Sequence, residues 1–221
     1  MDTSWLGDHR DVVVIDGPDA ATYLQSQASQ DLRDMAIGDE RWTFFLQPTG
    51  KVDVLARVKM AGDGRFELDT DPGYGPVLEA RLNRFKIRVK ATVEAVEAPT
   101  PSVDANLDVD EDVDEDRRIA AAWPKMGAEI IPGESIPAET GLDDVAISFT
   151  KGCYPGQELV ERMNSRGSTA PRHLELLPRR TDDTPGAAVT HDGAPIGTIT
   201  SVGTTHVLAY VKRGQDGGAR D

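Results

Sequence analysis

The sequence predicts an α+β protein built on antiparallel sheets. Short stretches in which apolar and polar residues alternate, the period of a half-buried strand, recur along the chain and are separated by turn residues. Stretches with helical spacing are fewer and lie at 20–29, 75–84, 117–123 and 155–166. At 221 residues, the chain is long enough to bury a sizeable core.

The first 96 residues predict the order β-α-β-β-β-α-β. A strand at 12–15 leads into turn residues, after which Asp19 is expected to cap the helix at 20–29. The second helix is expected at 75–84. The remaining strands are expected at 41–46, 51–60, 65–70 and 86–96. We take 1–97 as an N-terminal α+β part.

Residues 98–116 contain eight acidic side chains and no Lys or Arg, which predicts an acidic linker or exposed loop. A calcium loop starting at Asp108 would need Gly at its sixth position and Glu at its twelfth. The sequence has Val113 and Ile119 there, so this interpretation is rejected. The α+β part is expected to resume at 117–167.

In the region 168–214 the pattern changes from mixed helices and strands to strands alone. Four short strands are expected there, at 173–180, 187–191, 196–202 and 206–212, with Gly, Pro and Asp between them. Such a set predicts a small C-terminal β-barrel or sandwich. The last residues, 215–221, are expected to be a disordered tail.

Composition excludes several classes of protein. The net charge of −14 disfavours nucleic acid as a partner, because neutralising phosphates requires a basic surface. No apolar run approaches the roughly 20 residues that cross a bilayer, so no membrane partner is expected. The first residues lack the features of a signal peptide, and a single cysteine forms no internal disulfide. We therefore expect an acidic cytoplasmic protein.

The only cysteine, Cys153, comes just before the helix predicted at 155–166. Pro155 suits the first turn of that helix, and Gly167 suits its end. The unpaired N–H groups of a helix start favour a thiolate, as does Lys151 two residues before the cysteine. A lone cysteine is more often a small buried apolar residue, so both interpretations stay open at this point.

The segment 151–158, Lys-Gly-Cys-Tyr-Pro-Gly-Gln-Glu, resembles the signature Lys-Gly-Cys-Tyr-x-Gly-Gln-Glu of the YgfZ family. Those are folate-binding proteins of iron–sulfur cluster maintenance, related to the glycine-cleavage T-protein (GcvT), an aminomethyltransferase. The resemblance covers about 10–95 and 117–213, and the region between is shorter than in a typical member. It implies GcvT/YgfZ-like antiparallel α+β lobes around a central folate channel, with a small C-terminal β-barrel.

The resemblance implies a folate-binding accessory protein in iron–sulfur cluster assembly or repair. Its partners would be iron–sulfur client or assembly proteins, and its cofactor tetrahydrofolate or another folate derivative. Cys153 would be the reactive or ligating sulfur, and Lys151 would hold it as a thiolate or meet the glutamate tail of the folate. Gly152 and Gly156 are expected to set the geometry of the loop. The candidate folate contacts are Tyr154, Gln157, Glu158, Arg162, Gln27 and Arg172.

Purely structural roles are alternatives to some of these assignments. Gln157 and Glu158 could satisfy N–H groups of the first helical turn, and Arg162 could be an i,i+4 partner of Glu158. No tightly bound metal is expected, because the histidines lack metal-ligand spacing and an iron–sulfur cluster normally needs about four protein ligands. Cys153 could therefore hold a cluster only together with glutathione or a second protein chain.

Aminomethyl transfer, or another tetrahydrofolate-dependent one-carbon reaction, is the alternative function. In the T-protein, a strand after a glycine carries paired aspartates four and five residues on, one of them catalytic. Counted from Gly50, those positions are Val54 and Leu55. Asp53 comes one residue early and faces the other way from Val54 in a strand. The sequence therefore predicts that a buried apolar pair replaces the catalytic acid, and whether the protein is an enzyme stays open.

Overall fold

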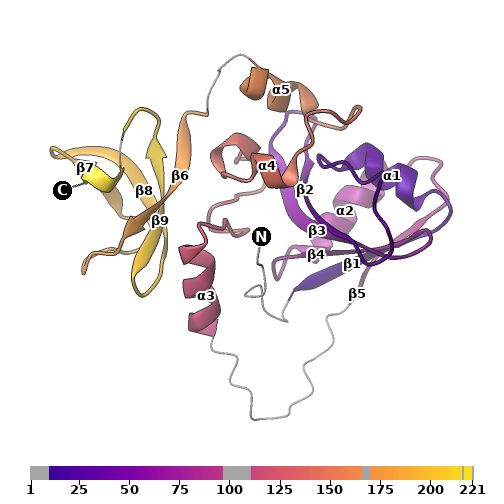
Figure 1. Ribbon diagram of the computed structural model, residues 1–221, viewed down its shortest axis with the longest axis horizontal. Coiled ribbons are helices and arrows are strands. Elements are labelled where there is room, and N and C mark those ends of the chain that lie inside the picture. Colours follow the sequence, from indigo (N-terminus) through magenta and orange to yellow (C-terminus); the bar gives the residue numbers. More distant parts are fainter. Residues whose placement is uncertain (1–9, 97–110, 166–169, 216, 221) are drawn as a thin grey trace, which may run out of the picture.

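Two antiparallel sheets lie toward opposite ends of the molecule in the computed structural model, with three helices between them (Figure 1). The structure describes residues 10–96, 111–165, 170–215 and 217–220. The helices between the sheets are α3 (Glu111–Ala120), α4 (Asp143–Ala146) and α5 (Gln157–Ser165). The short 3₁₀ segments are η2 (Pro137–Glu139) and η3 (Gly217–Ala219). The predicted α+β class with antiparallel sheets is confirmed.

The larger sheet has five strands in the order β2-β3-β4-β1-β5, and every neighbouring pair is antiparallel. The strands are β1 (Asp11–Asp16), β2 (Glu40–Leu46), β3 (Val52–Gly62), β4 (Arg65–Thr70) and β5 (Thr92–Val96). Two helices, α1 (Ala20–Gln27) and α2 (Gly75–Phe85), cover one face. Ile15, Leu24 and Leu82 are fully buried in the core between these layers.

The opposite face of β2 and β3 packs against the second half of the chain. Phe44 and Leu55 point into a core that also contains Ile130 and Tyr154. In the same core Trp42 on β2 meets Trp123, which follows α3, with ring centroids 4.8 Å apart. Tyr154 belongs both to this core and to the cysteine motif. The core therefore attaches the motif to the larger sheet.

The smaller sheet has four strands in the order β6-β9-β8-β7. They are β6 (Arg172–Pro178), β7 (Ala188–His191), β8 (Ala194–Val202) and β9 (His206–Lys212). In the described part of this region, β6 and β7 remain opposite edges and do not pair. Among the described residues the smaller sheet is therefore open, and the predicted C-terminal barrel is not detected.

The strand predicted at 86–96 is shorter than expected. Only 92–96 pairs with β1; Ile87 is exposed and Arg88 has φ +58°. The turn before α1 explains the difference. Asp19 occupies the N-cap position of α1 but makes no capping bond; its carboxylate instead accepts from the N–H of Lys90, at 2.8 Å. That contact holds the chain away from the sheet edge until residue 92.

Two helices start at other residues than predicted. Helix α3 begins at Glu111, inside the segment expected to be a linker, and six residues before the expected start. Helix α5 begins at Gln157 rather than at Pro155, because Gly156 has φ +84°, outside the helical range. The expected stop at Gly167 lies outside the described residues, as does most of the acidic segment.

The end of the chain also differs from the tail expected at 215–221. Its described part forms η3, and Arg220 is buried against the smaller sheet. The Arg220 guanidinium donates two hydrogen bonds to the Asp183 carboxylate, at 3.0 and 2.7 Å. A bidentate pair of this kind fixes the segment.

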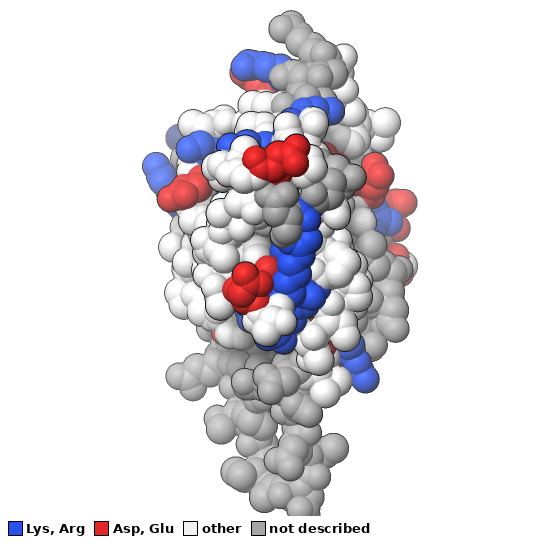
Figure 2. Space-filling view, turned by 90° about the vertical axis from the view of Figure 1, so that its left-hand side faces the viewer, with Lys and Arg blue, Asp and Glu red and all other residues white. Residues whose placement is uncertain are grey.

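The negative charge is unevenly distributed. The described residues 170–215 and 217–220 contain six Lys or Arg and four Asp or Glu, although the whole chain carries −14. On the side of the molecule formed by the smaller sheet, a band of basic side chains crosses a largely uncharged surface (Figure 2). No helix of the described residues has both the length and the hydrophobicity needed to cross a membrane.

Candidate functional site

Cys153 is a free, exposed thiol on the loop that precedes α5. The interpretation as a buried apolar residue is therefore wrong. The residues on either side of the exposed Gly152 and Cys153 are buried: Lys151 is 6% exposed and Tyr154 is 7% exposed. The Lys151 ammonium also lies 5.2 Å from the centroid of the Tyr154 ring. The fold thus presents one thiol to solvent on a short segment whose two ends are buried.

Lys151 attaches this loop to the first half of the chain. Its ammonium donates to the carbonyl of Gln25 at 2.7 Å, to that of Gln30 at 3.1 Å, and to that of Ala28. These carbonyls belong to the end of α1 and the turn after it, where the helix leaves carbonyl groups unpaired. Burial lowers the pKa of Lys151 to about 8. The ammonium is thus engaged with backbone carbonyls, which the expected thiolate or folate contact did not anticipate.

Gly156 fixes the other flank by close packing. It has φ +84°, and a Cβ atom there would lie 2.5 Å from the carbonyl oxygen of Gln47 and 2.9 Å from the Cα of Gly50. Gly50 is equally tight against Leu159 of α5. Gly152, by contrast, has open space where its Cβ would be. Glycine is therefore needed at Gly156 in this loop and at Gly50 in the turn between β2 and β3, which packs against it.

The polar candidates at the start of α5 lie along one helix and face largely outward. Gln157 donates to the carboxylate of Glu161, and both Glu158 and Arg162 are exposed. Within the described residues, Glu158 and Arg162 form no ion pair with each other. This group is next to Cys153 in sequence and is available to a ligand or a partner.

Gln27 belongs to a different, buried polar cluster. Its side-chain oxygen accepts from Arg81 at 3.0 Å, and Arg81 also donates to the carbonyl of Leu46 at 2.8 Å. The Arg81 guanidinium lies 3.2 Å from the Asp53 carboxylate. Val54 and Leu55 are buried on opposite faces of the sheet. Asp53, the acid nearest in sequence to the T-protein position, thus pairs with an arginine.

Arg172 lies in a third place, at the edge of the smaller sheet. It pairs with the carboxylate of Glu139 at 3.2 Å and lies 4.2 Å from the centroid of the Tyr210 ring. The predicted folate contacts therefore divide into three groups: the loop and α5, the cluster around Arg81, and this pair. The structure does not gather them around one space.

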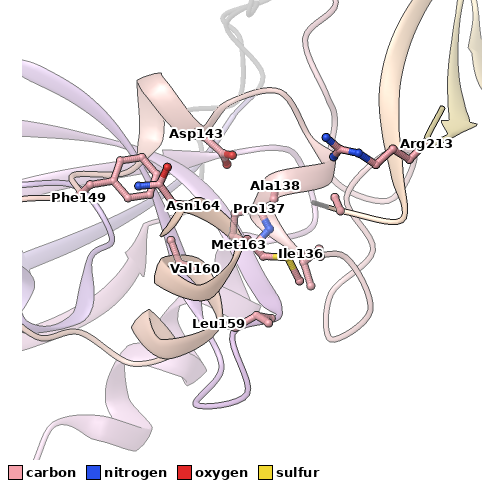
Figure 3. Close-up of a pocket in the computed structure, with 11 residues that line it drawn as sticks. Ile136, Pro137, Ala138, Asp143, Phe149, Leu159, Val160, Met163, Asn164 and Arg213 are labelled. Carbon is pink, nitrogen blue, oxygen red and sulfur yellow. The ribbon is translucent and has the colours of Figure 1, made fainter. Parts of the chain in front are cut away.

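A cavity of about 260 Å³ lies behind α5, and no predicted site residue lines it (Figure 3). Its walls are mostly apolar and come from η2, α5 and the chain around Phe149. One carboxylate oxygen of Asp143 is buried with no hydrogen-bond partner among the described residues. Leaving such an atom unpaired costs about 1–3 kcal/mol. Burial, together with the neighbouring Asp144, raises the pKa of Asp143.

Sequence reasoning missed Asp143 and Arg81. Arg81 had a signal, because it interrupts an otherwise apolar helix face between Leu78 and Leu82. Asp143 had none, since only the fold reveals that its oxygen is buried. In the described ranges, no group of three or more His, Cys, Asp or Glu side chains could hold a metal ion.

The architecture is that of an aminomethyltransferase of the glycine-cleavage type. The chain superposes on the aminomethyltransferase T of the glycine cleavage system from Bartonella henselae with a TM-score of 0.76. The match covers 93% of this chain and 76% of that one, at 18% sequence identity. At this identity the likeness establishes the fold, not the activity.

Curated relatives give a second comparison. The chain is 28% identical to a protein of Pyricularia oryzae named iron–sulfur cluster assembly factor IBA57 homolog, mitochondrial, over 95% of this chain and 66% of that protein. A protein of the same name from Neurospora crassa is 24% identical, over 76% and 52%. An uncharacterized protein of Haemophilus influenzae is 27% identical, over 71% and 67%.

The chain thus spans between about half and two thirds of the length of these relatives. No family model matches the sequence.

Proposed function

We propose that this protein is an accessory factor in iron–sulfur cluster assembly or repair and that it acts through Cys153, as a protein of the YgfZ type. The observation that carries the proposal is an exposed thiol on a loop whose two flanks are fixed by Lys151 and Gly156. Relatives named as iron–sulfur cluster assembly factors support this class over aminomethyl transfer. The pairing of Asp53 with Arg81 points the same way.

A single exposed cysteine suits transient contact with a cluster or with a client protein. Because a cluster normally takes about four protein ligands, the remaining ligands would come from the iron–sulfur client or assembly protein. The half-buried Gln157 and the exposed Glu158 and Arg162 follow the thiol in sequence and would meet that partner. Cytoplasmic location stays a prediction, and the named fungal relatives are mitochondrial.

Tetrahydrofolate or another folate derivative is proposed as the cofactor. The support for it is the fold, which is that of a folate-dependent aminomethyltransferase class, together with the sequence signature at 151–158. Whether a central folate channel exists between the lobes is part of this proposal. Binding is testable by titrating reduced folates and following the fluorescence of the buried Trp42 and Trp123.

Complementation tests the function. Cys153→Ala removes an exposed side chain, so the variant should fold with unchanged stability but fail to restore an iron–sulfur enzyme's activity in a strain lacking the protein. Gly152→Ala is the matched control, since the added methyl meets open space in the same loop. Full rescue by the cysteine variant would sink the proposal, whereas loss of activity in both variants would point to general damage of the loop.

A further inference from the structure

Four basic side chains gather where α2 ends and in the loop that joins it to β5. They are Arg84, Lys86, Arg88 and Lys90. The nearest acidic residues along the chain are Glu79 and Glu94, so this stretch is basic although the whole chain carries −14. In the ranges that the structure describes, none of the four cations forms an ion pair. We call residues 84–91 the basic loop; its charge is available to a negatively charged partner.

An apolar side chain lies in the middle of this charge. Ile87 is 77% exposed, more than any other large apolar residue in the described part of the chain. Arg88 follows it with φ +58°, in the left-handed region that costs an L residue free energy. One exposed isoleucine needs no explanation by itself. An exposed isoleucine among four unpaired cations, on strained backbone, is typical of a surface that contacts another molecule.

The basic loop is held in a fixed shape. The Lys86 ammonium donates to the carbonyl of Ala91 at 3.0 Å, which closes the loop on itself. At the far end, the Asp19 carboxylate accepts from the Lys90 N–H at 2.8 Å, and the Asp19 N–H donates to the Lys90 carbonyl at 3.3 Å. Gly17 packs against the same carbonyl so closely that a Cβ there would lie 2.4 Å from its oxygen. A surface that is already ordered loses less conformational entropy when a partner binds.

Helix α1 connects the basic loop to the cysteine loop. Asp19 precedes its first residue, and the Lys151 ammonium binds carbonyls at its other end. The helix has eight residues, which corresponds to a length of about 12 Å. Both α1 and α2 lie at the end of the molecule away from the smaller sheet (Figure 1). A partner that buries the standard ~800 Å² of this protein covers a patch wide enough to reach both loops.

We propose that the basic loop docks a partner protein whose surface has an apolar pocket for Ile87 and acidic side chains around that pocket. The proposal rests on the proposed function, since it takes this partner to be the iron–sulfur client or assembly protein that meets Cys153. Two loops at the ends of one helix then orient the partner. The basic loop supplies the charge and the apolar anchor, and the cysteine loop supplies the thiol.

Other occupants fit the basic loop less well. Nucleic acid offers no pocket for Ile87, and the net charge of −14 opposes binding of a polyanion. An anionic membrane would accept both the charge and the apolar tip, but one isoleucine buries too little area for stable insertion. A second copy of this chain would have to supply the acidic side chains from its own surface. The last two are outcomes of the test below.

Photocrosslinking in cells tests the identity of the partner. The photoreactive residue p-benzoylphenylalanine replaces Ile87 in one strain and Glu158, beside the cysteine motif, in another. Both positions should capture the same iron–sulfur protein, and the peptide attached to position 87 should carry net negative charge. The same replacement of Val77, an exposed apolar residue near the start of α2, should not capture it. Different proteins at the two positions, a peptide without net negative charge, a lipid adduct or a second copy of this chain would overturn the proposal.

Two variants test the basic loop by complementation. Ile87→Ser and Arg88→Gly should each lower the restored activity of an iron–sulfur enzyme about tenfold, as expected for loss of one interface anchor. Glycine suits φ +58°, so Arg88→Gly should not lower the midpoint of chemical denaturation, whereas a purely structural role of the arginine would lower it. Val77→Ser and Lys212→Gln, at exposed residues elsewhere, should change the activity less than twofold. Full activity in both loop variants would contradict docking at this loop.

The two proposals can fail separately. If Cys153→Ala abolishes complementation while Ile87→Ser and Arg88→Gly restore it fully, docking at the basic loop is wrong and the proposed function stands. If the two loop variants lose activity while Cys153→Ala retains it, the basic loop stands as a docking surface and the thiol is not required.

Discussion

Two parts of the second half of the chain, the cysteine loop and the smaller sheet, are each attached to the rest through a buried cation, but in different ways. Among the described residues, Lys151 binds three backbone carbonyls and no carboxylate. Arg118 of α3 pairs with Glu115 at 2.7 Å and Glu129 at 3.1 Å. It also donates to Ser201 of the smaller sheet, at 2.7 Å.

The two attachments consequently differ in charge. Burial lowers the pKa of Lys151 to about 8, since carbonyl dipoles replace hydration without supplying a counter-charge. Burial works in the same direction on Arg118, but the hydrogen bonds and charges of Glu115 and Glu129 outweigh it and raise the pKa. The smaller sheet is thus held by a permanent ion-pair network, and the cysteine loop by a cation that can be titrated.

Removing Arg118 should have the largest effect on stability. Arg118→Met leaves the Glu129 carboxylate, whose side chain is fully buried, without its counter-charge. Loss of one partner of a buried pair costs about 3–5 kcal/mol, which chemical denaturation would measure. The control is Arg117→Met, at a neighbouring arginine whose side chain is 62% exposed and, in the part of the chain that the structure describes, pairs only with Asp114. A loss of unfolding free energy below about 1 kcal/mol would mean that the ion-pair network does not hold the smaller sheet in place.

Gly156→Ala should have the next largest effect, and it tests the second anchor of the cysteine loop. The φ of +84° and the contact with the Gln47 carbonyl both oppose a methyl group. Backbone strain and overpacking together predict a loss of about 2–4 kcal/mol. Gly152→Ala in the same loop should cost much less, because its Cβ meets no atom within 4 Å. Equal losses at the two positions would contradict the assigned geometry.

The smallest effect, and the most specific, concerns pH. Between about pH 8 and 10 the unfolded chain retains the proton on Lys151 while the folded chain releases it, so this lysine makes the stability rise with pH. The rise should be about 2–3 kcal/mol across that window. It should vanish in Lys151→Met and persist in Lys51→Met, at an exposed lysine. Parallel stability–pH curves for wild type and Lys151→Met would refute the titratable anchor.

Sequence reasoning reached the class of fold because alternation of apolar residues is a local property. It went wrong where distant contacts decide, as with Ile87, whose apolar character suggested a strand although Asp19 holds the neighbouring segment away from the sheet. In the site, the cysteine motif could be found from residue types alone. The roles of Lys151 and Asp143 could not, since each depends on which groups the fold brings within hydrogen-bond reach.

The contact between Trp42 and Trp123 gives the molecule an optical signature. Two indole rings with centroids 4.8 Å apart and planes inclined by 60° couple their electronic transitions, which appears as an exciton couplet in circular dichroism. One ring belongs to the five-stranded sheet and the other to the segment that leads toward the cysteine loop. The couplet would therefore follow the docking of these two parts in real time, without a label and without touching the thiol.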